Sequence, residues 1–204
     1  ACAPYRRLHL CDYNLEKITD TNTTTTHNLL ADVLLAAKHE GESLEKYHAQ
    51  YRAKNEDFKT HICTELARSF ADIGDIIRGK DLYLGNKKKK QTKTEREKLE
   101  QKLKEIFKKI YENLVKNKED AKGHYGSDEN YYKLREDWWD ANRLEVWKAI
   151  TCHAGQSAQY FRHTCGTGKD RTATNHDCQC AGGTVPTYFD YVPQYLRWFE
   201  EWAE

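Results

Sequence analysis

The chain has 204 residues, of which 38% are hydrophobic and 32% charged, with a formal net charge of +1. It contains no run of eighteen apolar residues, so we expect no membrane span within it. The start, ACAPYRRLHLC, has arginines and cysteines where a signal peptide would be apolar. Only three prolines and many long polar side chains favour helices, in one large or two small domains.

Residues 1–20 form a cysteine-rich segment with a short predicted helix at 13–18, followed by a polar loop at 19–26. A helix is predicted from about Asn28 to Ala53, running across Gly41. Its inward face consists of Leu29, Leu30, Val33, Leu34 and Ala37. We expect two-faced helices throughout, because the apolar fraction is low.

The helix predicted at residues 58–79 organises the chain, and a second one at 129–153 packs against it, since neither can bury its apolar face alone. The first stripe consists of Phe58, Ile62, Leu66, Phe70, Ile73 and Ile77, and the second of Leu134, Trp138, Ala141, Leu144 and Trp147. The residues that we expect to be largely buried are Phe70, Ile73, Ile77, Trp138 and Trp147.

A lysine-rich stretch begins at Gly85 and leads into a helix, and a turn-rich break follows at 121–128. The apolar face of that helix consists of Leu99, Leu103, Ile106, Ile110 and Leu114. Residues 155–183 are irregular, and a closing helix is predicted from about Thr187. Its apolar stripe consists of Tyr188, Val192, Tyr195, Phe199 and Trp202. No alternating pattern is long enough for a sheet, so the predicted class is all-α.

Positive charge is concentrated in residues 87–122, which hold fourteen Lys and Arg against seven Asp and Glu, a net charge of +7. The rest of the chain therefore carries −6. The lysines with which we associate a glycan-binding surface are Lys87, Lys88, Lys89, Lys90, Lys93, Lys98, Lys102 and Lys109. Either they form a solvated face, or they bind a sulfated or phosphorylated polyanion by releasing counterions. Nucleic acid is a poor candidate, because the cysteines indicate disulfides and aromatic residues are scarce among these lysines.

Seven cysteines indicate disulfides and an oxidising, extracellular location: Cys2, Cys11, Cys63, Cys152, Cys165, Cys178 and Cys180. Because the count is odd, we interpret the chain as a fragment that lacks some of the cysteine partners. Sequence alone does not choose among the pairings.

Three patterns invite an enzymatic or metal-binding interpretation. Zinc binding by His176, Cys178 and Cys180 with Cys165 is disfavoured by the spacing. A Cys152 nucleophile with His153 or His163 lacks an oxyanion site. Asp72 and Asp75, beside Arg68 and Arg78, are better explained as structural ion pairs. We therefore expect no enzyme, no cofactor and no metal.

Four stretches resemble one family: ACAPYRRLHLCDYNLE, SFADIGDIIRGKDLYLG, WWDANRLEVWKAITC and VPTYFDYVPQYLRWFEEWAE. They are similar to the Duffy-binding-like domains of the malaria-parasite erythrocyte membrane protein 1 adhesins, and most of all to the α class. The resemblance covers almost the whole chain. It implies a disulfide-braced helical bundle with long loops. Residues 1–26 would end a first subdomain, residues 27–204 would form the second, and a third would be absent.

The resemblance also implies cysteine pairings. Cys63 is expected to bond Cys165, and Cys2 and Cys11 to pair with upstream cysteines that this chain lacks. Many α-class relatives have a cysteine where Leu34 stands. Cys152 is thus left to pair with Cys178 or Cys180, or to remain free.

The function implied by the resemblance is adhesion by a variant surface antigen, on the extracellular part of a membrane protein at the infected erythrocyte surface. The implied partners are host red-cell or endothelial receptors (heparan sulfate-type glycans, blood-group sugars, complement receptor), antibodies and adjacent domains of the same adhesin. Such binding would support rosetting and cytoadherence. The alternative is a structural and antigenic scaffold, with a neighbouring module binding the receptor.

Overall fold

The computed structural model describes residues 2–18, 25–55, 61–85, 92–118, 120–155, 158–166 and 168–204. Its helices are α1 (Tyr5–Leu8), α2 (Tyr13–Glu16), α3 (Thr26–Lys54), α4 (Ile62–Arg78), α5 (Glu95–Asn117), α6 (Asp120–Tyr125), α7 (Tyr132–Ile150), the 3-10 turn η1 (Phe189–Tyr191) and α8 (Gln194–Ala203). The predicted all-α class is confirmed, because these ranges contain two isolated β-bridges and no strand. None of the helices described there is long and apolar enough to cross a membrane.

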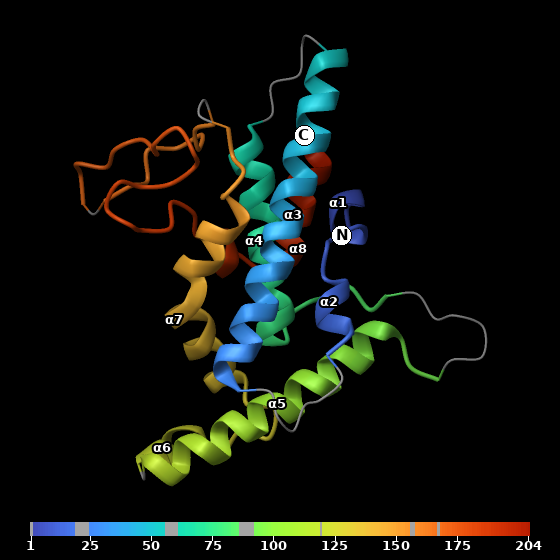
Figure 1. Ribbon diagram of the computed structural model, residues 1–204, viewed down its shortest axis with the longest axis vertical. Coiled ribbons are helices and arrows are strands. Elements are labelled where there is room, and N and C mark those ends of the chain that lie inside the picture. Colours follow the sequence, from blue (N-terminus) through green and yellow to red (C-terminus); the bar gives the residue numbers. More distant parts are fainter. Residues whose placement is uncertain are drawn as a thin grey trace.

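Helices α3, α4 and α7 pack side by side and form the centre of the molecule (Figure 1). The short α8 packs against α4, and α5 crosses the lower end of the bundle. The segment between α7 and α8 extends to one side as irregular loops. The pairing of the helix predicted at 58–79 with the one predicted at 129–153 is therefore confirmed, with α3 as the third member.

Local signals explain where the long helices begin and end. The Thr25 side chain caps α3 by accepting a hydrogen bond from the Asn28 amide. Thr94 and Glu97 form a capping box at the start of α5. Helix α4 ends at Gly79, whose φ of +73° is left-handed and suits glycine.

Gly41 permits α3 to run close to the end of α7. A Cβ at this position would lie 2.0 Å from the carbonyl oxygen of Ile150. Glycine at position 41 therefore lowers the helix propensity of α3, but it lets the backbones of α3 and α7 approach closely. The helix continues through Gly41, as predicted.

The five predicted core residues are all buried. The expectation of two-faced helices is wrong for α4, because every residue from Leu66 to Arg78 is buried. The α7 stripe is also wrong in part, since Ala141 is exposed and Trp139 is fully buried. Helix α7 contacts α3, α4 and α5, so more than one stripe of its surface is covered.

The predicted inward face of the closing helix is wrong, because α8 is inverted: its apolar stripe faces solvent and its polar side faces the bundle. Tyr188, Tyr195, Phe199 and Trp202 are 52–69% exposed, whereas the polar Gln194 and Arg197 are buried. Trp198 is the one large apolar side chain that α8 buries. The helix docks through hydrogen bonds and ion pairs, and its apolar face points to solvent.

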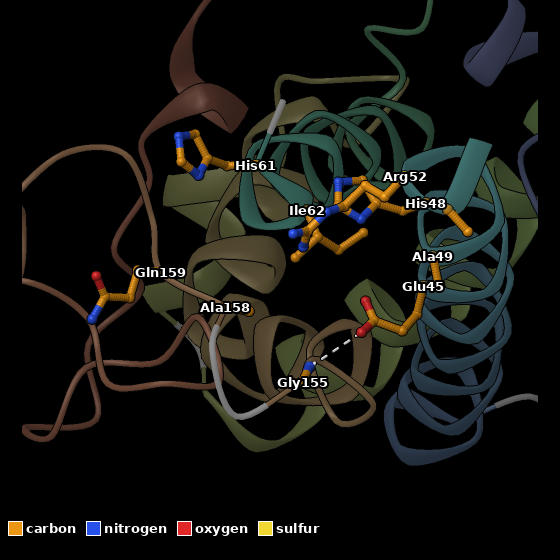
Figure 2. Close-up of a pocket in the computed structure, with 10 residues that line it drawn as sticks. Glu45, His48, Ala49, Arg52, His61, Ile62, Gly155, Ala158 and Gln159 are labelled. Carbon is orange, nitrogen blue, oxygen red and sulfur yellow. Dashed lines mark hydrogen bonds between the residues drawn. The ribbon is translucent and has the colours of Figure 1, made fainter. Parts of the chain in front are cut away.

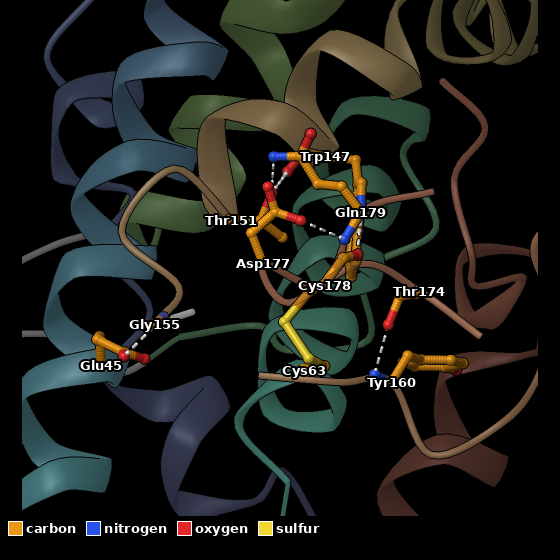
Figure 3. Close-up of a disulfide and its surroundings, with 10 residues drawn as sticks. All are labelled: Glu45, Cys63, Trp147, Thr151, Gly155, Tyr160, Thr174, Asp177, Cys178 and Gln179. Atoms are coloured by element: carbon orange, nitrogen blue, oxygen red, sulfur yellow. Dashed lines mark hydrogen bonds between the residues drawn. A yellow bond between two sulfur atoms is a disulfide. The ribbon is translucent and has the colours of Figure 1, made fainter. Parts of the chain in front are cut away.

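The loop after α7 is attached to the bundle in two ways. The Gly155 amide donates a hydrogen bond of 3.2 Å to Glu45 Oε1 on α3 (Figure 2). Farther along, Cys178 is bonded to Cys63 at the start of α4, and the Trp147 indole donates to the Cys178 carbonyl at 3.1 Å (Figure 3).

The predicted Cys63–Cys165 pairing is wrong. Cys165 is bonded to Cys180 instead, fifteen residues away, within the loop. The Cys178 amide donates a hydrogen bond to the Ala158 carbonyl, and the Ala158 amide donates to the His176 carbonyl, which places Cys178 next to the buried Cys63. Cys2, Cys11 and Cys152 are free in this chain, so Cys152 pairs with neither Cys178 nor Cys180.

Truncation of the central tryptophan tests the core. Trp147→Ala should lower the free energy of unfolding by about 3–5 kcal/mol, because the ring is buried and packs edge-on against Phe70. Trp202→Ala is the matched control and should cost about 1 kcal/mol or less, since Trp202 is 61% exposed. Urea unfolding measures both, and equal losses would contradict the core assignment.

The two disulfides should stabilise the fold unequally. Loop-closure entropy predicts a contribution of about 4.7 kcal/mol for Cys63–Cys178, which closes 115 residues, and about 3 kcal/mol for Cys165–Cys180. Replacing each pair by alanines and measuring thermal unfolding checks the order. Peptide mapping under non-reducing conditions checks the pairing itself, and a Cys63–Cys165 peptide would refute it.

Candidate functional site

The candidate site is the solvent-facing side of α5. Leu99, Leu103, Ile106 and Phe107 are buried on its inner side. The burial of Leu99, Leu103 and Ile106 confirms the first part of the predicted apolar stripe, and the lysines between these residues therefore lie on the outer side of the helix. Ile110 and Leu114, also predicted for this stripe, are partly buried against the core.

The predicted lysines of α5 differ in their availability. Lys98 and Lys109 are 43% and 44% exposed at their side chains and lie near Glu95 and Glu112, at 3.0 and 3.8 Å. Such exposed pairs are weak and leave the lysines available to another anion. Lys102 is different, because its Nζ donates a hydrogen bond of 2.7 Å to the Glu16 carbonyl and joins α5 to α2.

Lys87, Lys88, Lys89 and Lys90 lie outside the described residues. Lys93 is exposed just before α5 and, with Arg96 and Lys104, lines a cavity of about 450 Å³ between α4 and α5. The sequence analysis missed Lys104 and Lys108. Lys108 is 59% exposed beside Lys109, and its place next to a predicted surface lysine was the available signal.

Arg96 has a structural role. Its guanidinium pairs with Asp12 and lies near the Tyr83 ring, which Arg7 also contacts. Burial and the charge of Arg7 lower the pKa of Arg96 to about 9. Arg96 thus attaches the N-terminal segment to α5, and the cations open to a ligand on this side are lysines.

A buried ionic network lies apart from this surface, where α4 meets α1 and α8. Asp72 pairs with Arg6 at 2.7 Å and with Arg197 at 2.8 Å. Asp75 pairs with Arg78 at 2.8 Å and with Arg197. The prediction of structural ion pairs is confirmed for Arg78 but wrong for Arg68, which pairs with Glu65 and Glu204.

The two aspartates respond differently to this environment. Burial opposes ionisation of Asp72, but the charges of Arg6 and Arg197 outweigh it and lower the pKa. Burial dominates at Asp75 and raises its pKa to about 6, although Arg197 and Arg78 act against it. Asp72 therefore provides the more stable negative charge of the network.

The metal-binding and nucleophilic alternatives find no support in the geometry. Cys165, Cys178 and Cys180 are all bonded in disulfides and have no thiolate to offer zinc. Across the described ranges, no group of three His, Cys, Asp or Glu could hold a metal ion. The exposed Cys152 has no hydrogen bond to His153 or His163 within those ranges.

Comparison with known proteins identifies the family. A family model described as the Duffy binding domain matches residues 1–197. The chain belongs to this family. Among solved structures, the NTS-DBL1(α-1) domain of the Plasmodium falciparum membrane protein 1 (PfEMP1) from the varO strain is 47% identical, with a TM-score of 0.80. It covers 100% of this chain, which spans 43% of that structure.

More distant relatives carry the same domain. The PfEMP1 IT4var13 DBLβ domain, solved bound to ICAM-1, is 35% identical with a TM-score of 0.70, and this chain spans 44% of it. The Duffy receptor of Plasmodium vivax (strain Salvador I) is 25% identical over an alignment of 211 positions, which covers 99% of this chain and 15% of that protein. The predicted resemblance to α-class domains is confirmed, and the relatives are adhesion domains of PfEMP1 and Duffy receptors, which are binding modules rather than enzymes.

Removing the central counter-charge tests the ionic network. At neutral pH, Asp72→Asn should lower the free energy of unfolding by about 3–5 kcal/mol, because Arg6 and Arg197 stay buried with less compensation. Glu201→Gln, which removes the outer partner of Arg6, should cost less. Urea unfolding of the native chain and the two variants measures both losses in the free energy of unfolding and shows which is larger.

The Asp72 contribution should also depend on pH. Its pKa in the folded protein lies below the ordinary value of 3.8, so its stabilisation is fully present above that value. The stabilisation is lost as the pH falls through the folded-state pKa. The difference in free energy of unfolding between the native chain and Asp72→Asn should therefore become smaller in acid. A difference that grows there would contradict the assignment.

Proposed function

We propose that this Duffy-binding domain is part of an adhesion module displayed on the surface of infected erythrocytes, where it captures sulfated glycans of the heparan sulfate type. The observation that carries the proposal is the segregation of charge, with a net charge of +7 in residues 87–122 of a chain whose total is +1. Lys93, Lys98, Lys108 and Lys109 are all accessible on or just before α5.

The chemistry of these side chains sets the kind of recognition. Lysine is a compact charge without a fixed fork, so binding follows sulfate density more than sugar identity. Each neutralised sulfate releases counterions, so affinity falls with salt. Binding of this kind would support rosetting and cytoadherence. Blood-group sugars and complement receptor are the other ligands that we propose for such a module, and exposure on the cell surface would make it a target of antibodies.

Support also comes from the relatives. The IT4var13 DBLβ domain is bound to ICAM-1 in its structure, and the Plasmodium vivax relative is a Duffy receptor. Both names describe recognition of a host-cell molecule. The chain spans less than half of the solved domains, so we also propose that it holds the end of a first subdomain, in residues 1–26, and a second subdomain in residues 27–204.

A scaffold role is the second candidate, with the receptor bound by an adjacent module. The inverted α8 favours it, because a contiguous apolar face is normally covered by protein. The large apolar side chains exposed there are Tyr188, Tyr191, Val192, Tyr195, Leu196, Phe199 and Trp202. On this proposal, neighbouring parts of the same adhesin cover them.

Heparin affinity in a salt gradient tests glycan capture. A triple variant, Lys98→Ser, Lys108→Ser and Lys109→Ser, should elute at lower salt than the native chain. The slope of log affinity against log salt should become shallower by about 2–3, because each of the three lost contacts releases about 0.7–0.9 counterion. Lys102 is left in place because it supports α2. A second variant replaces Lys87, Lys88, Lys89 and Lys90 by Ser.

The control removes equal charge elsewhere. Lys38, Lys46 and Lys54 are exposed on α3, and their replacement by Ser should leave elution near the native position. If both lysine variants and the control elute with the native chain, the α5 surface is only a solvated face. The scaffold role is then preferred.

A further inference from the structure

We propose that the cavity between α4 and α5 seats a short sulfated segment of the glycan chain and so anchors the chain that the outer lysines of α5 hold. The inference rests on the proposed glycan capture and adds the place where the sugar itself is recognised. The cavity has a volume of about 450 Å³, within the range of small-molecule sites. It lies between the end of α4, one edge of α5 and the start of α7.

One edge of α5 forms the long wall of this cavity. Glu97, Gln101 and Lys104 are spaced by four and three residues, so they follow one another along the same edge of the helix. Lys93 lines the cavity just before the helix begins. At about 1.5 Å per residue, the helix alone separates Lys104 from the start of α5 by about 14 Å. A pair of lysines at the two ends of the cavity favours an elongated ligand with several anionic groups over a single small anion.

The acidic side chains that line the cavity already have partners within the protein. Asp81 pairs with Arg7. Glu100 accepts two hydrogen bonds from Arg135, at 2.7 and 2.8 Å. Glu97 belongs to the capping box at the start of α5. None of the three is left to serve as the counter-charge of a lysine in the cavity.

Lys93 and Lys104 are the cations that remain for a ligand. Neither has an ion pair or a hydrogen bond with another residue in the described ranges. They differ in this respect from Lys98 and Lys109 of the outer surface, which lie near glutamates. A sulfate group that enters the cavity therefore does not have to displace a carboxylate from these two lysines.

Tyr132, the first residue of α7, supplies an aromatic wall. A Cβ on Gly79 would lie 2.8 Å from Tyr132 Cε1, and the Arg135 guanidinium lies 5.7 Å from the ring centroid. Packing thus holds the ring in place, while 43% of the residue stays exposed. The negative face of an aromatic ring attracts the C–H edges of a sugar ring. Asn130 and Gln101 line the same cavity and offer amide groups to sugar hydroxyls.

These groups select a sulfated sugar rather than a polyanion of any kind. The lysines require negative charge, and the aromatic wall and the amides add contacts that only a sugar ring with hydroxyl groups can make. An acidic peptide meets the first requirement, and a neutral sugar meets the second. The outer lysines of α5 respond to sulfate density, whereas the cavity adds recognition of the ring.

Isothermal titration calorimetry at low salt tests the cavity, with four probes added to the 204-residue chain. A sulfated tetrasaccharide prepared from heparin should bind saturably. The same tetrasaccharide after desulfation, inorganic sulfate and hexaglutamate should bind at least ten-fold more weakly. Hexaglutamate that binds as well as the sulfated tetrasaccharide would show a site for acidic peptide and would overturn the proposal.

Matched variants decide whether the cavity carries this binding. Lys104→Gln should weaken the sulfated tetrasaccharide about ten-fold, the factor expected for one lost hydrogen bond to a charged group. Lys116→Gln removes the same charge from an exposed position of α5 that does not line the cavity, and it should bind as the native chain does. Tyr132→Leu keeps an apolar side chain but removes the ring, so it should also weaken binding while circular dichroism shows a native fold. Native affinity in Lys104→Gln, or equal losses in Lys104→Gln and Lys116→Gln, would overturn the proposal.

Heparin elution keeps this proposal distinguishable from the proposed function. A long heparin chain covers the outer lysines, so elution of the triple variant at positions 98, 108 and 109 tests that surface. Titration of Lys104→Gln with the tetrasaccharide tests the cavity. Native elution of the triple variant, with tetrasaccharide binding that depends on Lys104, would place glycan capture in the cavity alone. Early elution of the triple variant, with no saturable tetrasaccharide binding, would keep the α5 surface and overturn the cavity.

Discussion

The fold depends on burying α4 together with its charges. Asp72 and Asp75 lie inside the bundle, and their compensation comes from Arg78 of the same helix and from Arg6 and Arg197 of distant segments. Removing one member leaves its partners charged in a poorly solvating interior, which is far more costly than losing a surface pair. The network therefore fixes where α1 and α8 dock, and an apolar core alone would not specify those positions.

The same constraint explains the orientation of α8. Arg197 and Gln194 must face Asp72, so the aromatic side of the helix turns away from the bundle. Hydrophobic burial would favour the reverse orientation, at about 25 cal/mol per Å² of apolar surface. Satisfying the buried charges outweighs that gain here, and the aromatic face of α8 remains exposed.

The sequence predicted helices whose apolar residues recur with helical spacing. It did not predict features that depend on tertiary contacts, such as the orientation of α8. The spacing of Phe70, Ile73 and Ile77 correctly placed them in the core, because a buried stripe repeats every three or four residues, but it gave no sign that the rest of α4 is buried too. The same rule failed for α8, since amphipathicity tells which residues share a face but not which face is inward. The partners of Cys63 depend on how the loop folds back, which no spacing encodes. Lys102 was predicted as a ligand-binding lysine, but its hydrogen bond to the Glu16 carbonyl depends on how α2 packs against α5, which periodicity does not show.

The ionic network also sets the order in which the chain can fold. Arg197 follows Asp72 by 125 residues, and Glu201 follows its partner Arg6 by 195. During synthesis α4 emerges long before α8, so its aspartates cannot be fully compensated until α8 has left the ribosome. Contacts of such long range slow folding and prolong the exposure of aggregation-prone intermediates. Helix α4 can therefore reach its final buried state only after α8 has been made, so we expect this part of the molecule to assemble late and cooperatively.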